Sequence, residues 1–278
     1  METKARVLID CDDAKGLVYK ISKVFYDKAL NIDNNREFVD KDNGRFFMRS
    51  VVTGTFEPDE LLAELKEAAP VDADIKVIVP KPKKIILMAT KESHALGDIL
   101  IRYADGELDA EIECVIANHD MLETLVRRFD IPFICVPAEG LSREEHEEQV
   151  MEVINKFEFD FIVLAKYMRI LTPKFVKAYD EKIINIHHSF LPAFIGANPY
   201  KQAHERGVKI IGATAHFVTD DLDEGPIIAQ DVIPVNHRME WRDMQRAGRD
   251  VEKIVLSRAL SYVLSDRVFV YGNKTVVF

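Results

Sequence analysis

Two prolines and three lysines follow one another at Pro80-Lys81-Pro82-Lys83-Lys84. Proline has no backbone N–H and neighbouring lysines repel one another, so this stretch is typical of an exposed linker. The rhythm of the hydrophobic residues differs on its two sides. We therefore predict two domains, residues 1–80 and 85–278, joined by a linker at 81–84, as the length of 278 residues also suggests.

The first 80 residues contain strand and helix patterns in the order β-α-β-β-α-β. Alternating apolar residues at Ile75, Val77 and Val79 indicate the last strand, and apolar residues at helical spacing indicate helices near 17–25 and 58–69. A turn signal at 41–44 separates the two central strands. This order predicts a ferredoxin-like α/β domain.

After the linker, short apolar strands alternate with helical patterns. The strands are expected at 85–89, 112–117, 133–136, 161–165 and 183–187, followed by two more at 210–217 and 227–235. Helices are expected at 94–103, 121–129 and 143–157, in a short segment from Thr172-Pro173, and at 240–264. Apolar strands joined by helical crossovers predict a doubly wound, mostly parallel sheet.

Composition excludes several classes of partner. The chain has 37 basic and 47 acidic side chains, a net charge of −10, which argues against nucleic acid as the main ligand. No apolar run approaches the ~18 residues of a membrane span, and the N-terminus lacks the apolar core of a secretory signal. Three scattered cysteines without CxxC spacing argue against a disulfide framework or zinc site. We therefore expect a cytoplasmic protein that contacts neither membrane nor nucleic acid.

Polar residues end the strand at 183–187, where ligand sites of parallel sheets lie. Asn185 and His187 are two residues apart and should point to one face, with His188 on the other. An amide beside an imidazole can activate a carbonyl group. The alternative is a structural histidine bonded to backbone. A proline-containing loop through 190–199 follows.

An acidic turn over 220–225 follows a later strand. Either it is solvated, as most such runs are, or one of its carboxylates lies beside an imidazole, orients it and raises its basicity. A metal site is a third interpretation, but no His or Cys at ligand spacing accompanies the turn.

Several ordered motifs resemble the formyltransferase family, which uses 10-formyltetrahydrofolate. They are Asn185-Ile186-His187-His188-Ser189, Leu191-Pro192, and the segments 212–218 and 222–228. The resemblance implies a catalytic trio of Asn185, His187 and Asp223. The segment 163–171 resembles the family's folate-pocket segment, so folate is expected to contact Met168, Arg169, Ile170, Leu171 and, from a facing loop, Thr219.

The N-terminal half resembles an ACT domain, a small regulatory ligand-binding module, through the turn Asp12-Asp13-Ala14-Lys15-Gly16-Leu17. An ACT domain before a formyltransferase domain implies hydrolysis of 10-formyltetrahydrofolate to formate and tetrahydrofolate, with the formate feeding purine synthesis. The loop at 90–97 has a glycine only at its end, Gly97, and so lacks the glycine-rich backbone that would close on a phosphate. Glu92 would also repel a phosphate, so water is the expected acceptor. No metal or redox cofactor is expected. The alternatives are formyl transfer to an amine and a non-catalytic folate- or amino-acid-binding protein.

The ACT resemblance also implies an effector site. Glycine or methionine is expected to bind a homo-oligomer at Asp12, Lys15, Gly16, Leu17 and Asn31, with activity responding to one or both. A purely structural role in oligomerisation is the alternative.

Overall fold

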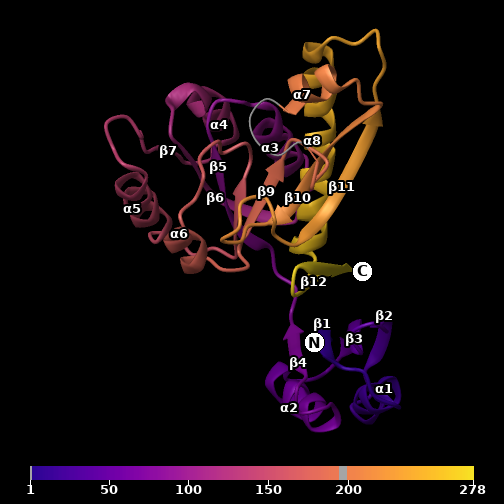
Figure 1. The fold of residues 1–278 in the computed structure, drawn as a ribbon. Helices are drawn as coiled ribbons and strands as arrows, with labels where there is room; N and C mark the ends of the chain where they lie inside the picture. The colour runs from indigo at the N-terminus through magenta and orange to yellow at the C-terminus, as the bar shows by residue number, and fades with distance from the viewer. Residues whose placement is uncertain (1, 194–198) are drawn as a thin grey trace. The chain divides into compact units, whose positions relative to one another are not determined.

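The computed structural model describes residues 2–193 and 199–278 and divides into two compact units (Figure 1). Residues 194–198, part of the proline-containing loop after 183–187, lie outside the described residues. None of the described helices is long and apolar enough to cross a membrane.

The first unit is built on one antiparallel sheet with two helices. Its elements are β1 (Thr3–Asp12), α1 (Leu17–Asp27), β2 (Asn31–Asp40), β3 (Arg45–Gly54), α2 (Pro58–Ala68) and β4 (Asp74–Ile78). The strand order β2-β3-β1-β4 confirms the predicted ferredoxin-like arrangement.

Both helices cover the sheet through one apolar face. In α1, Leu17, Ile21 and Phe25 recur every four residues and are buried, and Leu61 and Leu65 do the same in α2. They pack against alternate residues of β1, whose side chains point to one side of the pleated strand.

The end of the chain also belongs to this first unit. Asp266–Phe269 and Val276–Phe278 pack there, in the hairpin formed by β12 (Val268–Tyr271) and β13 (Lys274–Val277). Arg6 Nη1 lies 2.7 Å from Asp266 Oδ2, and the ring of Phe269 meets that of Phe47 edge-on at 5.7 Å. This differs from the sequence-based division, which placed all of 85–278 in the second domain.

The second unit contains a seven-stranded sheet in the order β11-β10-β9-β8-β5-β6-β7. The strands are β5 (Lys83–Ala89), β6 (Ala110–Ala117), β7 (Phe133–Cys135), β8 (Phe161–Leu164), β9 (Ile183–His187), β10 (Ile210–Phe217) and β11 (Ile227–Pro234). The five neighbouring strands β9, β8, β5, β6 and β7 are parallel to one another. β10 is antiparallel to both of its neighbours, β9 and β11. This confirms the mostly parallel sheet.

Helices lie on both faces of this sheet (Figure 1). α5 (Arg143–Ile154) and α6 (Pro173–Ala178) pack on one face, and α3 (His94–Ala104) and α8 (Trp241–Leu264) pack together on the other. The Thr172 hydroxyl accepts from Phe175 N at 3.3 Å and caps α6, as its sequence predicts.

Three sequence-based expectations about elements are corrected. Lys83 and Lys84 belong to β5 rather than to the linker, because pairing with β6 and a 2.8 Å bond from Lys84 N to Asp160 extend the strand. The helix expected at 121–129 is three short pieces, η1 (Asp120–Leu122), α4 (Glu123–Val126) and η2 (Arg127–Phe129). An additional helix, α7 (Pro199–Arg206), precedes β10.

Candidate active site

The polar residues at the end of β9 line a pocket of about 460 Å³ at the carboxyl ends of β8 and β9. Asn185 and His187 both line it, as their two-residue spacing predicts. His188, expected on the opposite face, lines it too, because β9 ends at His187 and the strand alternation stops there. Asp223 reaches the pocket from the turn between β10 and β11.

Asp223 and His187 form the central contact of this pocket. His187 Nδ1 lies 3.1 Å from Asp223 Oδ1, and both side chains are largely buried. Burial raises the pKa of Asp223, but the hydrogen bond and charge of His187, with His216 and His188, outweigh burial and leave the pKa below its usual range. Asp223 is therefore a carboxylate that accepts from His187 Nδ1–H.

The other ring nitrogen of His187 is available to a ligand. His187 Nε2 is buried and has no hydrogen-bond partner among the described residues. A buried polar atom without a partner is costly, so a bound molecule that supplies one is favoured. The Asp223 contact thus leaves Nε2 as the unpartnered ring nitrogen of a residue that lines the pocket.

The turn that carries Asp223 depends on close backbone packing. Asp223 has a left-handed φ of 58°. A Cβ at Gly225 would lie 1.9 Å from the Phe217 carbonyl oxygen, so only glycine lets the turn close onto β10 at this point. Glycine at position 225 is therefore required for the turn that carries Asp223.

His216 is a site residue to which the motifs assign no role. Its Nδ1 bonds the Phe217 carbonyl at 2.8 Å and is therefore the donor, which leaves Nε2 to accept from Asn185 Nδ2 at 3.2 Å. Burial lowers the pKa of His216 and keeps the ring neutral. The signal that sequence reasoning lacked is the register, which pairs His216 on β10 with Asn185 on β9.

The residues expected to contact folate line the same pocket. Met168, Arg169, Ile170 and Leu171 follow β8, and Thr219 follows β10. Met168 and Ile170 are 56% and 50% exposed, a large apolar surface at the pocket mouth that a flat aromatic ligand would cover. The structure brings these residues together with the trio, and their roles remain predictions.

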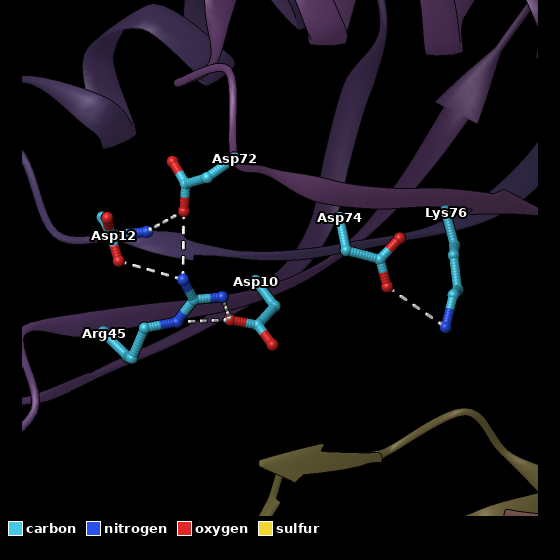
Figure 2. A network of polar contacts seen from close by, with 6 residues as sticks. All are labelled: Asp10, Asp12, Arg45, Asp72, Asp74 and Lys76. Carbon is cyan, nitrogen blue, oxygen red and sulfur yellow. Dashed lines mark hydrogen bonds and ion pairs between the residues drawn. The ribbon is translucent and has the colours of Figure 1, made fainter. Parts of the chain in front are cut away.

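The residues expected to bind an effector lie in the first unit and form two groups. Gly16 and Leu17 line a hollow of about 390 Å³ at the start of α1, and Lys15 is exposed beside them. Gly16 has a left-handed φ of 84°, which suits glycine at this helix start. Asp12 is 72% exposed and accepts from Arg45 Nη1 at 3.0 Å, in a network that also holds Asp10 and Asp72 (Figure 2).

Within one chain Asn31 lies apart from this group, and its part in a site formed between two copies stays a prediction. Asp12 pairs with Arg45 and Asn31 pairs with Thr53, at opposite ends of β3. Eight residues of strand correspond to about 26 Å. The antiparallel sheet places the end of β1 far from the beginning of β2, and Asn31 bonds Asp33 at 2.7 Å instead.

Comparisons with known proteins agree with this architecture. The family profile described as formyl transferase matches residues 83–260, and the ACT domain profile matches residues 5–70. A formyltetrahydrofolate deformylase of Escherichia coli is 57% identical over 96% of this chain and 95% of its own length.

Solved structures show the same relationship. A formyltetrahydrofolate deformylase from Pseudomonas syringae is 43% identical, with a TM-score of 0.95 over 100% of this chain and 95% of its own. A glycinamide ribonucleotide transformylase from Symbiobacterium toebii is 28% identical, with a TM-score of 0.68 over 71% of this chain and 94% of its own. The chain belongs to the formyltetrahydrofolate deformylase family, with an ACT domain before a formyl transferase domain.

Proposed function

We infer that this protein is an enzyme that hydrolyses 10-formyltetrahydrofolate to formate and tetrahydrofolate. The observation that carries the inference is His187, held by the Asp223 carboxylate on one side and presenting an unpartnered Nε2 to the pocket on the other. Asn185 stands beside it, with its amide oriented by His216. The relatives' names, at up to 57% identity over nearly the whole chain, support the same reaction.

The proposed chemistry is attack of water on the formyl carbon. The new bond joins the water oxygen to that carbon, and the carbonyl oxygen becomes an oxyanion that accepts from Asn185 Nδ2–H and from the Nε2–H that His187 gains with the water proton. The proton lost by water passes to the Asp223–His187 pair. The carbon–nitrogen bond then breaks, the nitrogen of tetrahydrofolate takes up a proton, and formate leaves. These steps use only side chains of this protein and water.

The trio is tested by single substitutions. Asn185→Ala, His187→Ala and Asp223→Asn should each lower kcat by ~10²-fold or more, the usual loss on removing an oxyanion donor or an acid–base group. Asp221→Asn is the matched control, because Asp221 lies in the same turn but does not line the pocket. Turnover close to wild type in any one of the three would remove that residue from the trio.

The reaction class is tested with wild-type protein and 10-formyltetrahydrofolate alone. Formate released without an amine identifies a hydrolase. Release only on adding an amine would indicate a transferase, and binding without release would indicate a non-catalytic folate-binding protein.

We propose that the pterin lies against Met168, Ile170 and Leu171, with Arg169 and Thr219 at the edge of the same pocket. The apolar surface at the pocket mouth supports this placement. Leu171→Asp should raise the folate KM, because it buries a charge against the ring. An unchanged KM would contradict the placement.

We further propose that the ACT domain makes activity responsive to glycine or methionine in a homo-oligomer. The hollow beside Gly16 and Leu17 and the exposed carboxylate of Asp12 support a small zwitterionic ligand. Coupling of about 1–3 kcal/mol is expected. Turnover and calorimetric binding are measured on the full chain with millimolar amino acid. If neither amino acid binds or changes turnover, only a role in oligomerisation remains.

The physiological proposal is that formate released in the cytoplasm supplies purine synthesis. A strain lacking the gene should then require a purine that added formate replaces. Normal growth of the deletion strain without added purine or formate would contradict this role.

A further inference from the structure

A second pocket of about 230 Å³ adjoins the catalytic pocket and shares Lys166, Met168 and His188 with it. Its other walls include Glu92 from the loop after β5, Tyr200 from α7 and Glu252 from α8. When folate fills the first pocket, a second substrate must reach the formyl carbon from an adjoining space of this kind. The contents of the second pocket therefore decide which molecules can accept the formyl group.

The second pocket is built around a buried carboxylate. The Glu252 side chain is 1% exposed, and its oxygens accept from Tyr200 Oη and contact His94 Nε2, each at 2.7 Å. Lys166 Nζ lies 3.3 Å from Glu252 Oε2, and the Lys166 side chain is only 4% exposed. The amino group of a second substrate could bind the Glu252 carboxylate, but the Lys166 ammonium group already lies there.

The backbone at Lys166 makes this arrangement unusual. Lys166 has a left-handed φ of 64°, where a side chain costs conformational energy and glycine does not. The carbonyl of Lys166 accepts from Thr90 N at 3.2 Å, which holds the strained conformation in place. A long cationic side chain at a position that favours glycine indicates that the side chain of Lys166 has a functional role.

We propose that Lys166 reserves the reaction for water by filling the place of an amine acceptor on Glu252. The proposal rests on the proposed hydrolysis and names the residue that sets its acceptor. As an ammonium, Lys166 has no lone pair and cannot attack the formyl carbon itself. At the pocket rim Arg249 Nε lies 3.3 Å from Glu92, so the guanidinium charge that would attract an anionic acceptor is also neutralised.

Removing the side chain should open the pocket to a small primary amine. In Lys166→Gly the amine nitrogen forms a bond to the formyl carbon, the bond from that carbon to the folate nitrogen breaks, and the amine proton passes to that nitrogen. The products are the formylated amine and tetrahydrofolate, with no oxidant or reductant. Glycine also relieves the left-handed backbone, which favours a folded variant.

The experiment measures formate and N-formylglycinamide from 10-formyltetrahydrofolate with increasing glycinamide. The proteins are wild type, Lys166→Gly, Lys166→Met and Glu181→Gly. Methionine keeps the length of the side chain without its charge. Glu181 is exposed and has a left-handed φ of 55°, so its variant repeats the backbone change away from the pocket.

The expected result is a ratio of formylated amine to formate at least about tenfold higher in Lys166→Gly than in the other three proteins. The proposal would be overturned if Lys166→Gly gave the same ratio of formylated amine to formate as wild type. It would also be overturned if Lys166→Met formylated the amine as well as Lys166→Gly does. Lys166→Ala replaces the glycine variant if the latter does not fold. Formate release by wild type without glycinamide tests the hydrolase function separately, so the two failures are distinguishable.

Discussion

At the scale of single residues, the candidate site depends on which nitrogen of each histidine carries its proton. The Phe217 carbonyl takes the Nδ1–H of His216, and Asp223 takes that of His187. His216 Nε2 therefore orients the Asn185 amide, and His187 Nε2 is left without a partner among the described residues. In the proposed mechanism His216 positions Asn185 and does not itself contact the substrate.

Replacing His216 with phenylalanine should therefore lower kcat by about 10- to 100-fold, because the Asn185 amide loses its orientation. KM should change little, since the apolar wall of the pocket is retained. Steady-state kinetics separate the two parameters. His237→Phe is the control, as His237 is exposed and away from the pocket. A His216→Phe variant with wild-type kcat would show that Asn185 needs no such support.

His188 should make the stability of the second unit depend on pH. Burial lowers its pKa from 6.5 to about 4, so the folded protein holds it neutral where the unfolded chain protonates it. Protonation then favours unfolding, and stability is lost as the pH falls from about 6.5 towards 4.

His188 should contribute about 2 kcal/mol to the loss between pH 7 and 4.5, and His188→Gln should remove that contribution, leaving the smaller loss due to other buried histidines such as His216. Urea unfolding followed by fluorescence of Trp241, the only tryptophan, measures the free energy of unfolding. The exposed His237, changed to glutamine, is the control. An equal loss of stability in His188→Gln and wild type would show that His188 is not the responsible group.

At the scale of elements, two glycines inside helices have opposite roles. Gly248 lies in α8, where a Cβ would come within 2.1 Å of the Tyr200 hydroxyl of α7. Gly97 lies in α3, and its nearest neighbour would be Leu125 at 3.9 Å. Gly248 therefore lets α7 approach α8 so that Tyr200 reaches Glu252. Gly97 makes room for no neighbouring side chain, because a Cβ there would be in ordinary contact with Leu125.

Gly248→Ala should destabilise the second unit by about 1–3 kcal/mol, because the overlap exceeds the gain in helix propensity. Gly97→Ala should stabilise it by about 0.5–1 kcal/mol, since alanine favours the helix and meets no obstacle. Both are read from urea midpoints. Changes of the same sign in the two variants would mean that contact with Tyr200 does not govern the position of α7.

At the scale of the whole molecule, both ends of the chain build the first unit. Phe269 is 8% exposed and packs edge-on against Phe47 and Phe278, and Asp266 pairs with Arg6. The stability of the ACT domain thus depends on residues nearly 200 positions beyond its family profile.

Phe269→Ala should destabilise the first unit by about 3 kcal/mol, as expected for a large aromatic removed from a core. Hydrogen exchange of the β1 and β3 amides reports on this unit directly and should become faster. Val277→Ala, at an exposed position of the same hairpin, should leave exchange unchanged. Unaltered exchange in Phe269→Ala would show that the C-terminal segment adds nothing to the first unit.

Local patterns and motifs were enough to predict the two domains, the succession of most strands along the chain and several residues of the pocket. Apolar alternation and helical spacing are local properties, so β1 to β4 and β5 to β9 could be predicted from neighbouring residues. Asn185 and His187 were found because a strand points every second residue to one face. Asp223, Met168 and Leu171 were found through motifs, and all of them line one pocket.

Contacts between residues far apart in the chain could not be read from such patterns. The register of β9 against β10 places His216 on Asn185, and the register of β2 and β3 separates Asn31 from Asp12. Folding of α8 onto the sheet brings Glu252 to Lys166, which is 86 residues earlier in the chain. These contacts depend on how helices and strands pack on one another. Packing involves residues far apart in the chain, so a local pattern of residues does not predict it.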